Sequence, residues 1–138
     1  MSIITSAQQI PKGYSLAECA VSGGNLRSCI LDLMKITEGR LCLSIRFYQA
    51  DFLLPATDGN GQELEQLHLT QLMKGRQSRY SASLCTNYFT YLEGENLHAV
   101  LYDTEKSILE KYKAAEACGV KLVFTEDPAV QQILNHGA

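Results

Sequence analysis

Three carboxylates stand where a parallel sheet places its reactive side chains. Asp51 follows a predicted strand over residues 41–48. Glu126 and Asp127 directly follow a second predicted strand, over residues 120–125. The carboxyl ends of parallel strands collect functional side chains, and two carboxylates about 5–10 Å apart can act as acid and base on a glycosidic bond. We take these three residues as candidate catalytic residues. The alternative is that Asp127 caps a helix and the other two are solvated loop ends.

Aromatic residues of the same segments are candidates for a ligand-binding surface. Tyr48, Phe52 and Phe124 stand in or beside the two predicted strands. They can line a groove for a sugar, because sugar rings stack on aromatic faces. The alternative is that they belong to the hydrophobic core, which is the commoner place for large aromatic side chains.

Arg46 is unusual because it stands within an apolar strand. An arginine that is buried requires a carboxylate partner. Asp51 or Glu126 on a neighbouring strand can supply that carboxylate. We therefore count Arg46 among the candidate ligand-binding residues, either in a structural ion pair or in an anion site.

The cysteines and histidines show no metal-binding pattern. The five cysteines lack C-x-x-C spacing, their number is odd, and four of them stand in apolar runs. We expect reduced, mostly buried thiols, no metal site and no cofactor. His98 stands in a predicted hairpin, where packing or hydrogen bonding is a commoner role than catalysis. The cysteines are Cys19, Cys29, Cys42, Cys85 and Cys118.

Composition limits the class of protein. The 138 residues are 46% hydrophobic and 20% charged, which is typical of a folded domain. The net charge of −3, without any run of Lys or Arg, argues against nucleic acid or membrane as the main partner. The N-terminus does not resemble a signal peptide, and no apolar run approaches the roughly 20 residues that span a bilayer. For the chain as given we expect a cytoplasmic location.

The first third of the chain predicts an arm, a strand and a helix. Residues 1–13 are polar and predict a flexible N-terminal arm, followed by a single α/β domain over residues 14–138. Residues 14–21 predict a short strand. Asn25 is a suitable N-cap for a helix over residues 26–37, whose apolar residues recur at helical spacing.

The middle of the chain predicts an inserted segment. Residues 56–102 stand between the strand over residues 41–48 and the next helix. They predict a short helix that stops near Gly75, a polar loop over residues 76–83 and a hairpin whose turn is residues 93–96.

The last third predicts helix, strand and helix. Asp103 is expected to cap a helix that ends before Gly119. The strand over residues 120–125 follows, and Pro128 opens a terminal helix. The predicted fold class is α/β: a small parallel sheet with flanking helices and right-handed crossovers, like part of a (β/α) barrel, with an inserted α+β hairpin segment.

Several segments together resemble a known family. Residues 40–55 read R-L-C-L-S-I-R-F-Y-Q-A-D-F-L-L-P, and the hairpin contains Y-F-T-Y, H-A-V-L-Y-D and, beyond it, S-I. These resemble the motifs K-L-x-L-G-I-P-x-Y-G-Y-D-W-x-L-P and Y-F-x-Y-x-D-G-x-x-H-x-V-W-F-E-D-A-x-S-I of glycoside hydrolase family 18, in its spore-cortex and LysM-linked branch. G-V-K-L-V-F at residues 119–124 is similar to the family's final strand.

The resemblance implies the seventh and eighth barrel strands, a remnant of the sixth and the insertion between strands. The family cleaves with a glutamate in an acidic cluster, D-x-x-D-x-D-x-E, and uses the acetamido group of the substrate as nucleophile. This sequence lacks that cluster and contains no Trp for the family's wall tryptophan. Ser44, Arg46 and Gln49 replace residues of the family's G-I-P-x-Y-G motif. Hydrolysis by the family mechanism is therefore not expected from this chain.

The sequence predicts a non-catalytic, family-18-like module. It would bind an amino-sugar glycan or a protein partner, and it would self-associate, because a small sheet leaves edges that pair with another chain. One alternative is a glycosidase for N-acetylglucosamine-containing glycans whose site is assembled across an oligomer. Another is a truncated, inactive fragment of a larger glycosyl hydrolase. Relatives in the family are often associated with spores or cell walls.

Overall fold

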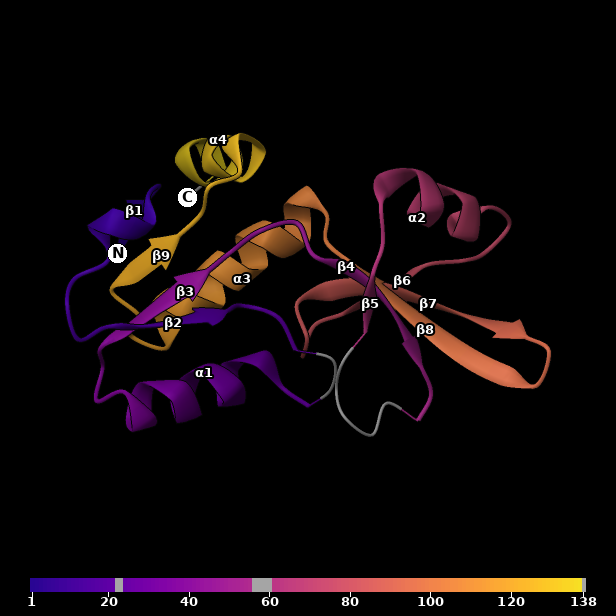
Figure 1. Ribbon diagram of the computed structural model, residues 1–138, viewed down its shortest axis with the longest axis horizontal. Helices are drawn as coiled ribbons and strands as arrows, with labels where there is room; N and C mark the ends of the chain where they lie inside the picture. The colour runs from indigo at the N-terminus through magenta and orange to yellow at the C-terminus, as the bar shows by residue number, and fades with distance from the viewer. Residues whose placement is uncertain (22–23, 56–60, 138) are drawn as a thin grey trace.

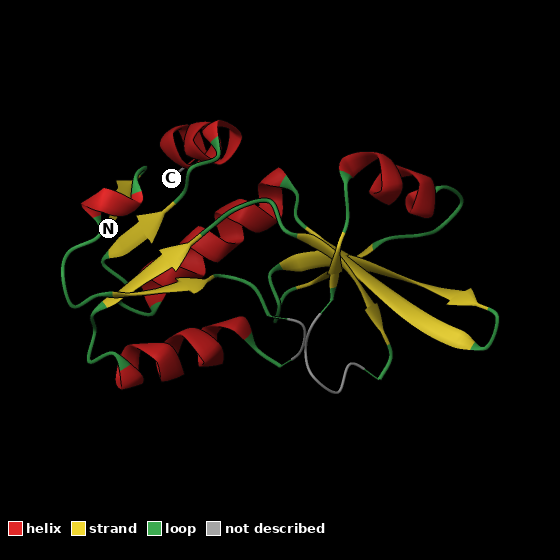
Figure 2. Cartoon of the chain, viewed as in Figure 1, coloured by secondary structure: helices red, strands yellow, loops and turns green. Residues whose placement is uncertain are grey.

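The computed structural model describes residues 1–21, 24–55 and 61–137. Residues 56–60, where the predicted insertion begins, lie outside the described residues. The described residues form a parallel sheet with three helices and an antiparallel sheet with one helix (Figures 1 and 2). This confirms the predicted α/β class with an inserted α+β segment. No described helix is long and apolar enough to cross a membrane.

The parallel sheet has the order β1-β9-β3-β2. Every pairing in it is parallel, so the carboxyl ends of all four strands lie at one edge (Figure 1). The strands are short, which is typical of segments joined by helices. They are β1 (Ser2–Ile4), β2 (Ser15–Glu18), β3 (Leu41–Ser44) and β9 (Leu122–Phe124).

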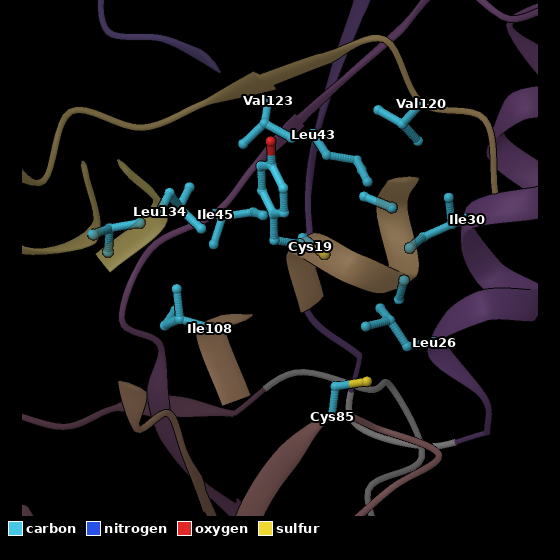
Figure 3. Close-up of a cluster of buried hydrophobic side chains, with 14 of the residues drawn as sticks. Cys19, Leu26, Ile30, Leu43, Ile45, Cys85, Ile108, Val120, Val123 and Leu134 are labelled. Carbon is cyan, nitrogen blue, oxygen red and sulfur yellow. The ribbon is translucent and has the colours of Figure 1, made fainter. Parts of the chain in front are cut away.

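Helices α1 (Leu26–Ile36), α3 (Glu105–Ala117) and α4 (Pro128–Gly137) bury one face of this sheet. Alternate residues of β3 and β9 supply the sheet side of the core, because successive side chains of a strand point to opposite faces. Leu43 and Val123 are fully buried there (Figure 3). The helix side of the same cluster includes Leu26, Ile30, Ile108, Val130 and Leu134.

The predicted first helix is confirmed with its cap. The Asn25 side chain accepts a hydrogen bond from the backbone N–H of Ser28 at 3.1 Å. Gly39 has φ of 81°, a left-handed conformation, and its N–H donates to the carbonyl of Met34 just beyond the helix. The local signals at both ends of this helix therefore agree with the structure.

Part of the predicted flexible arm is a strand. The N–H of Ser2 donates to the carbonyl of Lys121 at 2.9 Å, and Ile4 accepts from the N–H of Thr125. Ile3 packs against the main core. Pairing with β9 and the packing of Met1 and Ile3 against the core order this segment, although its neighbours are polar. A 3-10 turn over Ala7–Gln9 follows.

The inserted segment is an antiparallel sheet with the order β5-β4-β8-β7-β6. It begins at Gln49, earlier than predicted, because the chain turns after β3 and pairs with β8. The predicted hairpin is confirmed, with Gly94 at φ of 63° in its turn. The strands are β4 (Gln49–Leu53), β5 (Gln62–Glu63), β6 (Arg79–Ser81), β7 (Thr86–Glu93) and β8 (Asn96–Tyr102), and α2 is Gln66–Met73. Strand β6 replaces part of the predicted polar loop.

The predicted role of Asp103 as a helix cap is wrong. Thr104 caps α3 instead, because its side chain accepts from the N–H of Ser107. Asp103 is buried and accepts from Lys111 Nζ at 2.9 Å, Ser107 Oγ at 2.6 Å and the N–H of Tyr48 at 3.0 Å. The side chains of Asp103 and Lys111 are only 0% and 3% exposed. This ion pair therefore joins α3 to the junction between the two sheets.

Removal of one partner of the buried pair should destabilise the fold strongly. Lys111→Met leaves the Asp103 carboxylate buried without its counter-ion, which costs about 3–5 kcal/mol in comparable sites. Urea unfolding followed by circular dichroism measures the free energy of unfolding. Lys113→Met is the matched control, because Lys113 pairs with Glu110 on the surface of the same helix and such pairs contribute about 0–1 kcal/mol. Equal losses for the two variants would contradict a structural role for the buried pair.

Candidate functional site

A cleft opens at the carboxyl ends of the parallel strands. It has a volume of about 540 Å³ and is lined by the last residues of β2, β3 and β9 and by the residues that follow β3 and β9, namely Glu18, residues 44–47 and residues 124–127. Strands β2, β3 and β9 end side by side because they pair in parallel register. Carboxyl ends of parallel strands are the usual position of ligand sites in such sheets. This cleft is the candidate binding site.

Arg46 lines the cleft and lies between two glutamates. Its Nε donates to Glu18 at 3.2 Å and its Nη2 to Glu63 at 2.6 Å. The guanidinium carbon also lies 5.1 Å from the centre of the Tyr48 ring, a cation–π distance. Partial burial opposes the charge of Arg46, but the hydrogen bonds and charges of Glu63 and Glu18 outweigh it, so the pKa of Arg46 is raised. The arginine is a fixed cation.

The predicted partners of Arg46, Asp51 and Glu126, are wrong. Asp51 lies on β4 and its carboxylate contacts Tyr91 and His98, whereas β5 pairs with β4 and brings Glu63 to the guanidinium. Glu18 is the last residue of β2, but the predicted strand extends to residue 21, so the rule that selected Asp51 does not select it. Glu63 carries no such signal either, because β5 is only a two-residue strand.

The candidate aromatic residues separate into two groups. Phe124 lines the cleft, together with Phe47, which the sequence did not single out. Tyr48 is partly buried beside Arg46, and this burial raises the pKa of its phenol. Phe52 does not line the cleft. It lies in a separate cluster of the antiparallel sheet with Ala50 and Leu101, so for this residue the core interpretation is correct.

Two carboxylates follow β9. Asp127 makes a helix-capping hydrogen bond, and Glu126 makes none with the described residues. Asp127 Oδ1 accepts from the N–H of Ala129 at 2.9 Å, at the start of α4. This is the capping role that was kept as the alternative for Asp127. Glu126 lines the cleft and makes no ion pair or side-chain hydrogen bond with the described residues. It is the carboxylate best placed to meet a ligand.

Asp51 belongs to a different cluster. It lies on β4 and accepts a hydrogen bond from the Tyr91 hydroxyl, while its other oxygen lies 2.8 Å from His98 Nδ1. The Tyr91 and His98 rings stack with centres 4.7 Å apart. Burial and the hydrogen bond to Asp51 raise the pKa of Tyr91, which keeps its phenol protonated as the donor. Asp51 therefore ties three strands of the antiparallel sheet together.

The described residues do not bring three or more His, Cys, Asp or Glu side chains into a metal-binding group. All five cysteines are free thiols, and Cys19, Cys42 and Cys85 are buried. Burial raises the pKa of the Cys19 thiol to about 12, so it is a packing residue rather than a nucleophile (Figure 3). The polar and aromatic groups that line the cleft are carboxylates, one guanidinium, the hydroxyl-bearing Ser44 and Thr125, and two phenylalanine rings.

Asp51→Asn should weaken the antiparallel sheet. An amide loses the charge-assisted bond to His98 and presents an N–H₂ group to one of its two neighbours, so we expect a loss of about 1–3 kcal/mol. Urea unfolding measures this change. Glu95→Gln, at the exposed turn of the hairpin, is the control and should change the stability by less than about 0.5 kcal/mol. A neutral Asp51→Asn would mean that the cluster does not hold the strands.

No protein-family model matches the sequence, and no curated protein is similar to it. Solved structures do match. The chain superposes on a chitinase from Chromobacterium violaceum with a TM-score of 0.60 at 18% identity, covering 91% of this chain and 45% of that one. A chitinase C-terminal domain from Desulfitobacterium hafniense gives 0.58 at 17%, covering 88% and 44%. The spore cortex-lytic enzyme SleL of Bacillus megaterium gives 0.59 at 13%, covering 89% and 33%.

These similarities show the fold alone, because the identities are low. The chain spans less than half the length of each of these three solved chains. Most of this chain is matched in each case. The chain has the fold of part of a glycoside hydrolase family 18-like barrel, as the resemblance in its sequence implied.

Proposed function

We propose that this chain is a non-catalytic, family-18-like module that binds an amino-sugar glycan in the cleft at the carboxyl ends of β2, β3 and β9. The observation that carries the proposal is the chemistry of the cleft lining. Within about 540 Å³ it combines carboxylates, a paired guanidinium and two phenylalanine side chains. Protein sites for polar rings need such a mixture of apolar walls and a few fixed polar groups.

Each group in the lining has a partner on a sugar. The Glu126 carboxylate accepts hydrogen bonds from hydroxyl groups, and Arg46 retains N–H donors beyond those used by Glu18 and Glu63. Phe47 and Phe124 offer apolar surface to the faces of a ring. Because Glu18 and Glu63 already neutralise Arg46, the cleft favours a neutral polyol over a free anion.

Binding without hydrolysis is supported by the state of the carboxylates. Two-carboxylate glycoside hydrolysis needs an acid and a second carboxylate on opposite sides of the bond. Asp51 is held by His98 and Tyr91, Asp127 caps α4, and Glu18 is paired with Arg46. Glu126 remains alone. The family's own mechanism needs only one glutamate, because the acetamido group of the substrate is the nucleophile, but that glutamate belongs to the acidic cluster D-x-x-D-x-D-x-E, which is absent from the sequence.

The glycan is chosen by analogy with the structural neighbours. Two of them are named as chitinases and one as a spore cortex-lytic enzyme. Chitin is a polymer of N-acetylglucosamine, so its tetramer is the first ligand to test.

Arg46→Ala should weaken binding of the N-acetylglucosamine tetramer. A hydrogen bond to a charged group contributes about 1.5–3 kcal/mol, so the affinity should fall by roughly tenfold to a hundredfold. Isothermal titration calorimetry measures the dissociation constant. Arg40→Ala is the control, because Arg40 is an exposed arginine outside the cleft whose carboxylate contact is Glu38 at 4.0 Å. No binding by the unaltered chain, or equal affinities for both variants, would refute the proposed site.

Glu126→Gln tests the alternative of a glycosidase. If the chain only binds, a chromogenic N-acetylglucosaminide should not be turned over by the unaltered chain, and Glu126→Gln should change the affinity alone. Turnover that is lost in Glu126→Gln, with binding retained, would instead establish an enzyme that uses this carboxylate. The alternative is kept because Glu126 is the cleft carboxylate without an ion pair or side-chain hydrogen bond among the described residues.

A further inference from the structure

Strand β7 has an open edge along its outer half. Strand β6 pairs with β7 only at Thr86, Asn87 and Tyr88. From Phe89 to Glu93, no described strand lies on the side of β7 that faces away from β8. A strand edge of this kind presents unpaired backbone groups and is a template for another strand.

The backbone of Leu92 faces this open edge. The carbonyl of Leu97 on β8 accepts from the N–H of Leu54, so Leu97 turns its backbone groups toward the β4 side. Leu92 is the cross-strand partner of Leu97. In an antiparallel ladder such a pair exchanges no hydrogen bonds, so the N–H and C=O of Leu92 point outward. Thr90, two residues earlier, points the same way.

Apolar side chains accompany this edge. Leu92 is 68% exposed and Leu97 is 41% exposed, and the two lie side by side on the face of the sheet opposite His98. Exposed leucines that adjoin an unpaired strand edge are typical of a contact surface rather than of a free surface.

Two residues of opposite charge, Glu93 and Arg76, lie beside this edge on the face of the sheet that carries Tyr91. Glu93 stands at the hairpin end of β7, on the same face as Tyr91. The guanidinium of Arg76 lies 5.0 Å from the centre of the Tyr91 ring. Because His98 stacks on one side of that ring, toward β8, Arg76 lies on the other side, toward the open edge. Neither Arg76 nor Glu93 makes an ion pair within the described chain.

We propose that β7 pairs antiparallel with β7 of a second copy of this chain, around a two-fold axis at Leu92. In this register Leu92 of each copy lies opposite Leu92 of the other, and the exposed leucines meet on one face. On the other face, Glu93 of each copy lies opposite Tyr91 of the other, beside Arg76. An antiparallel pair of identical edges satisfies both charges twice, which no parallel arrangement does.

This surface is separate from the cleft and uses none of the residues that line it. Dimerisation through this surface and glycan binding in the cleft can therefore be tested independently. A dimer without glycan binding would support the surface and refute the proposed function. Glycan binding by a monomer would support the proposed function and refute the dimer surface.

The unaltered chain should be a dimer, and a charge at the axis should separate it. Light scattering coupled to gel filtration, at high micromolar concentration, should give twice the chain mass. Leu92→Lys places two lysines opposite each other and should give one chain mass. Ile36→Lys is the matched control and should remain a dimer, because Ile36 is 77% exposed on α1, far from β7. A monomeric unaltered chain, or a dimer that survives Leu92→Lys, would overturn the proposal.

An exchange of the two charges tests the register by the recovery of the dimer as well as by its loss. Glu93→Lys opposes lysine to Arg76 of the second copy, and Arg76→Glu opposes glutamate to Glu93. Each variant alone should dimerise on the order of tenfold more weakly. An equimolar mixture of the two should recover the dimer, because every contact then joins opposite charges. Recovery also shows that both variants are folded. Failure of the mixture to recover would exclude the Arg76–Glu93 contact and with it this register.

Discussion

The buried contact between Asp103 and Lys111 is the interaction on which the arrangement of the two sheets depends. Asp103 directly follows β8 of the antiparallel sheet, and Lys111 belongs to a helix that covers the parallel sheet. Asp103 also accepts from Tyr48, where the chain passes from one sheet to the other. A buried charge without its partners is costly, so other placements of the two sheets lose several kcal/mol at this point. The apolar clusters on each side supply stability, but they do not by themselves specify this junction.

The geometry of the cleft follows from this junction. Tyr48, which Asp103 holds through its backbone, comes two residues after Arg46 in the chain. Arg46 in turn joins Glu18 of the parallel sheet to Glu63 of the antiparallel sheet. Arg46 therefore links the cleft, whose lining residues end or follow strands of the parallel sheet, to the antiparallel sheet. The inserted segment supplies no strand residue to the cleft lining, but its Glu63 holds the binding residue Arg46 in position.

Local signals predict the helices and the hairpin, but they do not predict the short strands β1 and β6 or the long-range pairing of the strands. Asn25 was recognised as a cap because its hydrogen bond lies within three residues. The predicted N-cap of α3 is wrong by one residue. Both Asp103 and Thr104 can cap a helix, and only the contact of Asp103 with the buried Lys111 decides between them. The partners of Arg46 lie 28 and 17 residues away, on strands whose register the sequence pattern does not fix. For the same reason Asp51, assigned to the cleft, lies in the other sheet.

The two sheets treat their edges differently, and this bears on where a second chain can pair. The edges of the parallel sheet are strands of three and four residues, β1 and β2, and β2 ends in the charged Glu18 at the cleft. Short strands and charged side chains are the usual protection against edge pairing. Strand β7 has eight residues, carries the exposed Leu92 on its open half, and has charges arranged so that they attract an inverted copy rather than repel it. The small size of the predicted parallel sheet indicates self-association at its edges. The physical properties of the edges favour β7 instead, and they leave the cleft open to a ligand.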